Sequence, residues 1–293
     1  MDEQPTMSRR HAVGAESARG LLFTVLGEFV LPSGSAAWTS SFIEVFGRMG
    51  VEEKAIRQAL MRTASGGWLK PERTGRRTLW HLTPAAERLL TEGTERIYGF
   101  TSTFPGWDGR WLFVLARAPE TDRRARHLLR TRLSWAGFGS PSPGVWISPH
   151  LDRVPEAEAA LGEAGLAADA HIFVAEHHPG QPGGRLEAMV RQAWDLDALE
   201  ARYEAFIGEF GERDQARSGA GGCTPHDPLV RVTELVHAWR RFPWTDPALP
   251  TALLPARWSG AEAARLFSRL HARWSADAAA EWRCLNSPGD PGR

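Results

Sequence analysis

The sequence predicts an α+β protein built from several domains. Apolar residues recur at helical spacing in most of residues 15–98 and again after residue 185, whereas residues 110–178 alternate between short apolar runs and helical stretches. Near the N-terminus, a basic helix runs into an arginine-tipped pair of strands, which is typical of a winged helix-turn-helix. We therefore predict an N-terminal winged helix-turn-helix, a central ferredoxin-like α+β domain and a C-terminal all-α domain.

Length and composition fit a soluble protein with more than one core. The chain has 293 residues, of which 42% are hydrophobic and 24% charged, and its formal net charge is zero. No apolar run approaches the roughly 18 to 20 residues that cross a bilayer, and Met1 to Arg10 is too polar for a secretory signal. Cys223 and Cys284 are too few for a disulfide framework or a cysteine-based zinc site. These features predict a cytoplasmic protein with two reduced thiols and no membrane partner.

The N-terminal domain is predicted over residues 15–98, after a disordered tail at residues 1–14. A first core helix runs from Leu21 to Val30 and is broken by the Pro, Ser and Gly residues at 32–35. Thr39 or Ser40 can cap a second helix, and Gly50 is its expected C-terminal stop. The connection to a third helix is therefore tight.

The third helix is predicted to carry DNA-contacting side chains on its outer face. Its inward positions are Val51, Ala55, Ile56, Ala59 and Leu60, and its outward positions are Glu53, Lys54, Arg57, Gln58, Met61 and Arg62. In a major groove, Arg can hydrogen-bond guanine and Gln can hydrogen-bond adenine, while other bases hold phosphates. On its own, such a face is more typical of an ordinary solvated helix.

The segment after this helix favours DNA binding. Trp68 to Lys70 and Thr78 to Leu82 alternate like short strands around an arginine-rich turn. Seven basic residues lie between Lys54 and His81 against one acid, Glu72; they are Lys54, Arg57, Arg62, Lys70, Arg73, Arg76 and Arg77. Such concentrated charge in a neutral protein indicates an anionic partner. We predict that Lys54, Arg57, Gln58 and Arg62 on the helix and Arg73, Arg76 and Arg77 on the wing contact double-stranded DNA.

A new domain is predicted over residues 105–180, because the periodicity changes there. Thr83 and Pro84 start a helix that closes the first domain, and a Thr, Pro and Gly-rich linker follows. Strands are expected at 111–115, 145–147 and 171–175, with helices at 123–136 and 155–166. Five arginines crowd the first of these helices, namely Arg123, Arg124, Arg126, Arg130 and Arg132. They fit either a second DNA contact or a solvated, acid-paired helix surface.

The last predicted domain, residues 185–280, is helical. Residues 186–210, 229–242 and 261–274 have helical periodicity, and a Pro-punctuated connector separates the second from the third.

Four separated sequence blocks carry a family resemblance. They are Ala55-Ile56-Arg57-Gln58-Ala59-Leu60 with Gly67-Trp68-Leu69; Trp107-Asp108-Gly109-Arg110-Trp111; Gly137-Phe138-Gly139 with Pro143-Gly144-Val145-Trp146-Ile147-Ser148-Pro149; and Leu235 to Pro243, continuing through Asp246-Pro247, Leu249-Pro250, Leu253-Leu254-Pro255 and Trp258. In this order they resemble the PaaX family of bacterial transcriptional repressors, regulators of phenylacetic acid catabolism. The resemblance covers nearly everything from Ala18 to Trp274.

The resemblance implies a function and partners. It implies a ligand-responsive repressor that binds a palindromic operator as a homodimer and is released by an acyl-coenzyme A (acyl-CoA) effector, typically phenylacetyl-CoA. It also implies a central domain similar to the small ferredoxin-like nucleases of CRISPR adaptation.

The block around His237 is the candidate effector site. Leu235, Val236, Trp239 and Phe242 supply apolar surface, while His237, Arg240 and Arg241 offer donors for a phosphate or thioester oxygen. We take His237, Trp239, Arg240 and Arg241 as ligand-binding candidates. The alternative is that Trp239 and Phe242 are core residues, that Arg240 pairs with Asp246, and that the connector is a structural strap.

An enzyme, either an acyl-CoA hydrolase or a metal-dependent nuclease, is the alternative from another class. His171, His177, His178 and Glu176 could bind a divalent metal, although a His-rich strand end is more often a polar exit from a sheet. A nuclease needs acids where the first central strand ends, and the chain there reads Leu115-Ala116-Arg117-Ala118-Pro119. We therefore predict no catalytic residues, no metal site and no cofactor.

Overall fold

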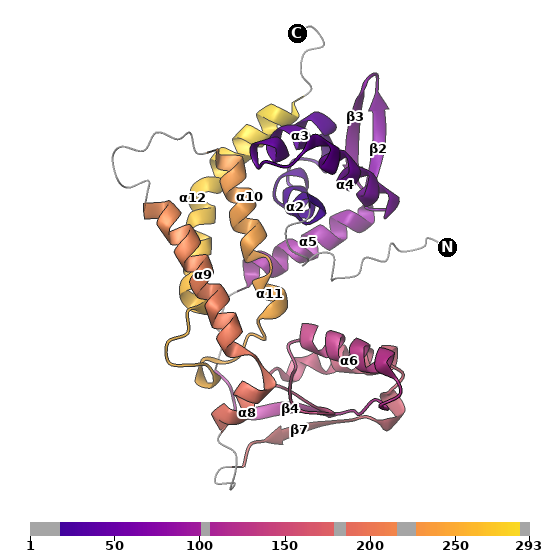
Figure 1. Ribbon diagram of the computed structural model, residues 1–293, viewed down its shortest axis with the longest axis vertical. Coiled ribbons are helices and arrows are strands. Elements are labelled where there is room, and N and C mark those ends of the chain that lie inside the picture. The colour runs from indigo at the N-terminus through magenta and orange to yellow at the C-terminus, as the bar shows by residue number, and fades with distance from the viewer. Residues whose placement is uncertain (1–17, 101–105, 179–185, 216–226, 288–293) are drawn as a thin grey trace. The chain divides into compact units, whose positions relative to one another are not determined.

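The computed structural model describes residues 18–100, 106–178, 186–215 and 227–287. The predicted disordered tail at residues 1–14, residues 101–105 of the predicted linker, and Cys223 lie outside these ranges. Contacts divide the chain into two compact units (Figure 1). The first unit joins Met1–Phe100, Gly208–Arg241 and Arg265–Arg293, and the second joins Thr101–Ile207 and Phe242–Ala264. Within the described ranges, no helix is both long and apolar enough to cross a membrane.

The first unit contains a helical framework with a three-stranded sheet at one side. Its elements are α2 (Ala18–Val25), which continues as a π-helical turn η1 (Leu26–Val30), β1 (Ala36–Trp38), α3 (Thr39–Arg48), α4 (Glu53–Ser65), β2 (Leu69–Thr74), β3 (Arg77–Leu82), α5 (Pro84–Gly99), α10 (Pro228–Trp239) and parts of α9 (Leu196–Gln215) and α12 (Gly260–Asn286). The sheet is antiparallel with the order β1-β3-β2.

The connection between α3 and α4 is a close helix-helix turn. Gly50 has a φ of 75°, a left-handed conformation that glycine adopts without a Cβ clash, and the amide of Val51 bonds the carbonyl of Phe46 at 2.9 Å. α4 packs on both α2 and α3, and Phe42 and Phe46 of α3 and Ile56 of α4 are fully or almost fully buried. This turn therefore sets the angle at which α4 leaves the core.

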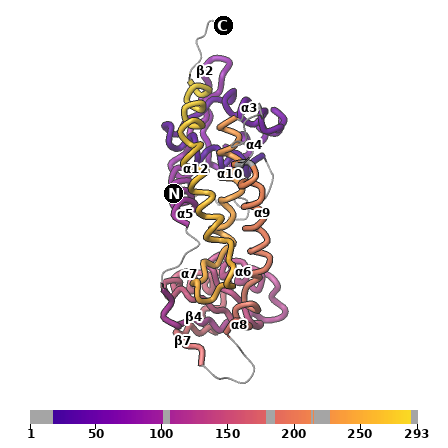
Figure 2. The backbone as a smooth tube through the Cα atoms, turned by 90° about the vertical axis from the view of Figure 1, so that its left-hand side faces the viewer, coloured from indigo at the N-terminus to yellow at the C-terminus, as the bar shows by residue number. Residues whose placement is uncertain are grey.

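The C-terminal helices complete the core of the first unit. α10 packs on α2 and α3, and α12 lies beside it (Figure 2), with Trp239 stacked on Phe267 at 4.8 Å. At the far end of α12, Trp282 stacks on Phe29 with ring centroids 5.7 Å apart. The side chain of Asn286 accepts a hydrogen bond from the amide of Trp38 and donates one to the carbonyl of Ala36, both in β1. The last helix of the chain thus holds the small N-terminal sheet.

The second unit is a four-stranded antiparallel sheet with two helices on one face. Its elements are β4 (Arg110–Leu115), α6 (Arg123–Trp135), β5 (Gly139–Ser142), β6 (Val145–Ser148), η2 (Leu151–Arg153), α7 (Val154–Glu163), η3 (Ala167–Asp169), β7 (His171–Glu176), α8 (Leu186–Ala193), α11 (Phe242–Thr245) and η4 (Thr251–Leu253), with the start of α9 and of α12. The strand order is β5-β6-β4-β7.

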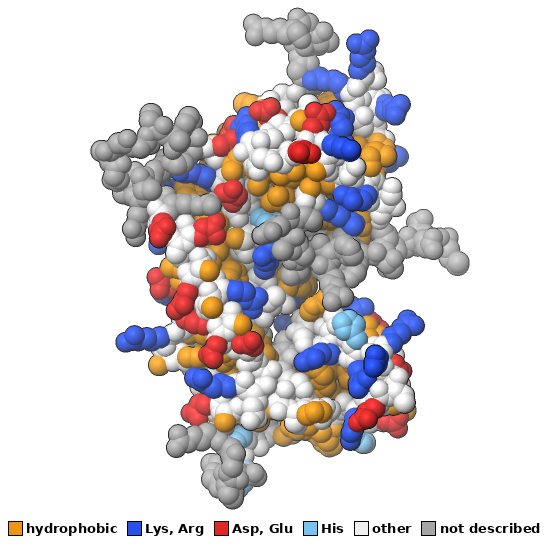
Figure 3. Space-filling model, in the orientation of Figure 1, with side chains coloured by type: hydrophobic (Ala, Val, Ile, Leu, Met, Phe, Trp, Pro, Cys, Tyr) orange, Lys and Arg blue, Asp and Glu red, His pale blue; other side chains and the backbone are white. Residues whose placement is uncertain are grey.

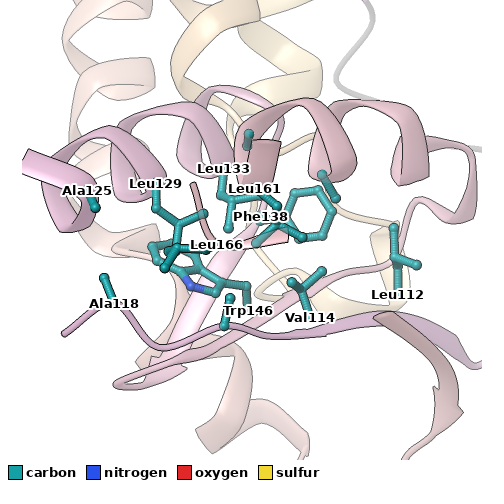
Figure 4. Close-up of a cluster of buried hydrophobic side chains, with 13 residues drawn as sticks. Leu112, Val114, Ala118, Ala125, Leu129, Leu133, Phe138, Trp146, Leu161 and Leu166 are labelled. Carbon is teal, nitrogen blue, oxygen red and sulfur yellow. The ribbon is translucent and has the colours of Figure 1, made fainter. Parts of the chain in front are cut away.

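Opposite faces of this sheet bury different clusters. Leu112, Val114 and Trp146 point toward α6 and α7, where they meet Leu129 and Leu133 (Figure 4). On the other face, Trp111 and Ile147 pack against α8 and against Leu249 and Leu253 of the connector. The alternation along β4 is the period-two pattern of a strand that is covered on both sides.

Most elements predicted from the sequence are present, but several details differ. Strand β1 was not predicted, and the helix expected at 261–274 is longer and runs as α12 from Gly260 to Asn286. Thr83 caps α5 as predicted, accepting from the amide of Ala86 at 3.3 Å. Thr39 and Ser40 do not cap α3, because the helix begins at Thr39 and the hydroxyl of Thr39 donates to the carbonyl of Thr78 instead. The helix expected at 186–210 is broken in two at Trp194 and Asp195. Strand β5 was not predicted, since its Ser-Pro-Ser sequence has little strand propensity.

Candidate DNA-binding surface and ligand site

α4 separates its buried and exposed sides cleanly. Ile56, Ala59, Leu60 and Thr63 are buried against α2 and α3, at the spacing of one helix face. The opposite face is exposed and lines an open surface depression; its residues are Glu53, Lys54, Arg57, Gln58, Met61 and Arg62. The structure therefore brings together the four helix residues that the sequence proposed as DNA contacts.

Arg57 is held by an acid on its own helix. Its Nη2 lies 2.7 Å from Oε1 of Glu53, one turn earlier, and both side chains are more than half exposed. Glu53 sits in the first helical turn, where a carboxylate also interacts favourably with the helix dipole. Lys54 and Arg62 form no ion pair with any other described residue. The face thus has one cation that is paired within the helix and two that are not paired with any described residue.

The β2–β3 hairpin carries the three arginines that the sequence predicted for a wing. Gly75, with a φ of 61°, takes the first position of a two-residue loop, where a left-handed backbone is required, and Arg76 takes the second. Arg73, Arg76 and Arg77 are exposed, and the Arg77 guanidinium lies 5.2 Å from the centre of the Trp38 ring. Basic side chains accordingly gather over the hairpin and the neighbouring α4 (Figure 3).

The only acid that the sequence places among these bases is paired within the hairpin. Oε2 of Glu72 lies 2.7 Å from Nε2 of His81 on the facing strand. Glu72 is therefore engaged within the hairpin by His81.

The arginines of α6 have mixed environments. Arg132 forms an ion pair with Glu163 of α7 at 2.7 Å, as expected for an acid-paired surface. Arg123, Arg124, Arg126 and Arg130 are exposed. A second DNA contact on this helix stays a prediction.

The described residues hold no cluster of three or more His, Cys, Asp or Glu side chains that could bind a metal ion. The ring of His171 lies against Phe173 of the same edge strand, with centroids 6.0 Å apart. Cys284 is exposed and free.

Trp239, one of the candidate ligand residues, has a structural role. It is completely buried, stacks on Phe267, and its indole N–H donates to the carbonyl of Ile97 at 3.3 Å. Such a ring is part of the core that joins α10 to α5 and α12. A ligand could contact it only after the surrounding side chains move.

His237 and Arg240, at the end of α10, are polar groups that the core leaves incompletely satisfied. Nδ1 of His237 lies 2.9 Å from the hydroxyl of Thr24, whereas Nε2 is buried without a hydrogen-bond partner. Arg240 is 8% exposed, its Nε is likewise unpartnered, and it forms no ion pair with any other described residue. Arg240 directly follows the last residue of α10, where the helix dipole favours a cation.

Burial lowers the pKa of both side chains. The pKa of His237 falls to about 3, mainly because burial disfavours the imidazolium and secondarily because Arg240 and Arg241 are positive. Burial, with a contribution from Arg241, lowers the pKa of Arg240 to about 10. At neutral pH His237 is therefore neutral and Arg240 charged, so this end of α10 would favour an anion.

The alternative proposed for the block around His237 was that Arg240 pairs with Asp246 and that the connector is a structural strap. No ion pair joins Arg240 to Asp246 among the described residues. Asp246 accepts hydrogen bonds from the hydroxyl of Tyr203 at 2.5 Å and from the amide of Ala248 at 2.6 Å. Burial raises the pKa of Asp246 in spite of these bonds. The connector acts as a strap, since Leu249 and Leu253 are buried on the sheet and Nε2 of His150 donates to the carbonyl of Pro247 at 3.0 Å.

The first unit also contains a cluster of charged side chains around Arg48 that was not predicted from the sequence. Arg48, at the end of α3, is bonded to Glu44, to Asp227 at the start of α10 and to Glu281 of α12. These carboxylates raise the pKa of Arg48. Only the Glu44 contact, at helical spacing, could be read from the sequence.

Family models match the chain in three consecutive segments. "PaaX-like protein" matches residues 17–86, "PaaX protein central Cas2-like domain" matches residues 105–186, and "PaaX-like protein C-terminal domain" matches residues 194–284. Transcriptional repressor PaaX of Escherichia coli (strain K12) is 31% identical over 267 residues, which are 90% of this chain and 83% of that protein.

A solved structure has the same fold. The uncharacterized protein Rv0674 from Mycobacterium tuberculosis superposes with a TM-score of 0.60 at 23% identity, covering 91% of this chain and 99% of that one. The matched segments together describe a three-part regulator with a basic helix and hairpin in its N-terminal part. The chain belongs to the PaaX family of transcriptional regulators.

Proposed function

We propose that this protein is a transcriptional repressor that binds operator DNA through α4 and the β2–β3 hairpin. The observation that carries the proposal is the exposed cationic face of α4 beside an arginine-tipped hairpin. In this proposal residues 15–98 form a winged helix-turn-helix, α4 is the recognition helix and the hairpin is the wing. The order of helices and strands in this segment and the similarity to a repressor support it.

Different residues of this surface have different roles. Arg57 and Gln58 read base edges, with Glu53 holding the Arg57 guanidinium until DNA replaces it. Lys54, Arg62 and the wing residues Arg73, Arg76 and Arg77 contact phosphates or the minor groove, so that affinity falls as salt rises. Residues 105–180 are the proposed ferredoxin-like domain, since their β-α-β-β-α-β order fits that fold, and residues 185–280 the proposed helical domain.

We further propose that the protein acts as a cytoplasmic homodimer and is released from DNA by phenylacetyl-CoA or a related acyl-CoA. The neutral His237 and the buried Arg240 offer a donor and a cation for such an effector, and Arg241 adds a second cation. Trp239 enters the proposal as the core residue through which an altered α10 would disturb α5 and α12. The proposed coupling to DNA runs through the contact of His237 with Thr24 of α2, which also packs on α4.

A mobility-shift titration tests this function. Purified protein is added to the DNA upstream of its own gene, with phenylacetyl-CoA, with free coenzyme A or with neither, at fixed salt. Binding that only the thioester abolishes supports both repression and the effector. Binding that no thioester changes removes the effector from the proposal, and absence of binding contradicts the proposed function.

A further inference from the structure

Met61 is an apolar side chain on the surface proposed to bind DNA. It is 59% exposed, more than any other large hydrophobic side chain that the structure describes. The buried residues of α4 lie on its other side, so most of the Met61 side chain lies outside the core. A single exposed apolar side chain is ordinary by itself, so a partner for Met61 has to be inferred from its position on the surface.

The position of Met61 indicates what that partner is. At about 100° of rotation per residue, Met61 lies about 20° from the direction of Lys54 and about 40° from that of Arg57 around the helix. It therefore stands in the middle of the cationic face and not at its edge, and it lines the same depression as Gln58 and Arg62. A protein or membrane partner would have to present matching anions around one apolar group.

DNA meets both requirements. Its phosphates complement Lys54, Arg57 and Arg62, and its major groove presents one exposed apolar group of this kind, the C5-methyl of thymine. A methionine side chain has three rotatable bonds and a polarizable sulfur, so it can adjust to such a methyl group.

We propose that Met61 contacts the C5-methyl group of a thymine in the major groove and thereby selects thymine at one position of each operator half-site. The inference rests on the proposed DNA-binding function and adds to it a base-specific apolar contact. Cytosine at that position lacks the methyl group and presents a donor where thymine presents an acceptor.

The test removes the methyl group from DNA and the thioether from the protein, separately and together. After footprinting on the upstream DNA, each protected thymine is replaced in turn by deoxyuridine, which keeps every hydrogen-bonding group. Dissociation constants are measured for the wild type, Met61→Ala and Met61→Leu at one salt concentration. Circular dichroism checks that the variants are folded, which the exposure of Met61 leads us to expect.

We expect one position in each half-site to be sensitive to deoxyuridine. A single replacement at such a position should weaken wild-type binding about fourfold, the value for burying one methyl group. On thymine DNA, Met61→Ala loses about as much or more, and the same deoxyuridine then has no further effect. Met61→Leu, which keeps an apolar side chain, stays sensitive to deoxyuridine.

Two results overturn the inference while leaving the proposed function intact: wild-type binding that is unaffected by deoxyuridine at every position, or a deoxyuridine penalty that is unchanged in Met61→Ala. If the wild type binds no upstream DNA, the proposed function fails and this inference fails with it.

Discussion

Replacing Arg48 by alanine should destabilise the first unit although Arg48 is no part of the proposed DNA surface. Its Nη1 lies 2.8 Å from Asp227 and also bonds Glu281, and its Nε lies 3.1 Å from Glu44. Asp227 additionally caps α10, accepting from the amides of Leu229 and Val230. Removal of the guanidinium leaves three carboxylates close together at the junction of α3, α10 and α12.

The size of the expected loss in stability follows from how far Arg48 and its partners are buried. Arg48, Asp227 and Glu281 have side chains that are 29%, 20% and 28% exposed. Hydrogen bonds to charged groups contribute about 1.5 to 3 kcal/mol when buried, and solvent screening reduces this for partly exposed pairs. We expect a loss of roughly 2 kcal/mol in the free energy of unfolding. With a denaturant slope of about 2 kcal/mol per molar urea, the midpoint falls by about 1 M.

Urea titrations followed by circular dichroism measure this loss, and Arg57→Ala is the matched control. Arg57 also has an ion pair, with Glu53 at 2.7 Å, but the two side chains are 57% and 55% exposed. A helix pair of that kind contributes about 0.5 kcal/mol or less. If Arg48→Ala lowers the urea midpoint no more than Arg57→Ala does, the three-helix junction is not held by Arg48 and the reasoning is refuted.

Three further predictions concern DNA binding and pH. Arg57→Ala should weaken specific operator binding by about 1 to 3 kcal/mol in a mobility-shift titration, and unchanged affinity would rule out α4 as the recognition helix. Arg76→Ala should weaken binding to operator and random DNA alike and reduce the salt dependence; a loss confined to the operator would contradict a phosphate-contacting role. Because the folded-state pKa of His237, about 3, lies below its unfolded value near 6.5, its contribution to stability is complete above pH 6.5 and is lost as the pH falls toward 3. At pH 5 that loss is roughly 2 kcal/mol, so His237→Gln should flatten the fall of the melting temperature between pH 7 and pH 5, and an unaltered slope would refute the burial of a neutral imidazole.

Local sequence signals predicted the elements of the proposed DNA-binding surface well. Apolar spacing placed Ile56, Ala59 and Leu60 correctly on the inward face of α4, whereas Val51 precedes the helix and Ala55 is only partly buried. Gly50 follows the end of the preceding helix, and Thr83 caps the next one. Each of these features depends on residues within a few positions of one another. The roles of Arg57 and its neighbours toward DNA stay predictions.

Contacts between distant parts of the chain could not be read in the same way. Arg48 meets Asp227 and Glu281, 179 and 233 residues away, and nothing near Arg48 in the sequence marks it as different from other exposed arginines. The same holds for α10, where the apolar spacing is equally compatible with a ligand pocket and with a core. In the structure, Trp239 is a core residue packed on α12, and Arg240 forms no ion pair with any other described residue.

Strand β5 could not be predicted from the sequence for a different reason. Its sequence contains Pro141 and three small residues, so propensity argues against a strand. Its place at the sheet edge tolerates the missing amide, and Gly139 leaves room for Trp194, whose ring would lie 2.5 Å from an added Cβ. Packing of α8 on this edge therefore outweighs local preference.

The most direct test of the central proposal compares two duplexes of identical composition, the protein's own upstream DNA and a scrambled version, by fluorescence anisotropy over a series of salt concentrations. We predict specific binding at least a thousandfold tighter than non-specific binding, about the lower limit for operator-binding proteins, with both affinities falling as salt rises. Equal affinity for the two duplexes, or no binding even at low salt, would contradict the assignment of α4 and the β2–β3 hairpin as an operator-reading surface.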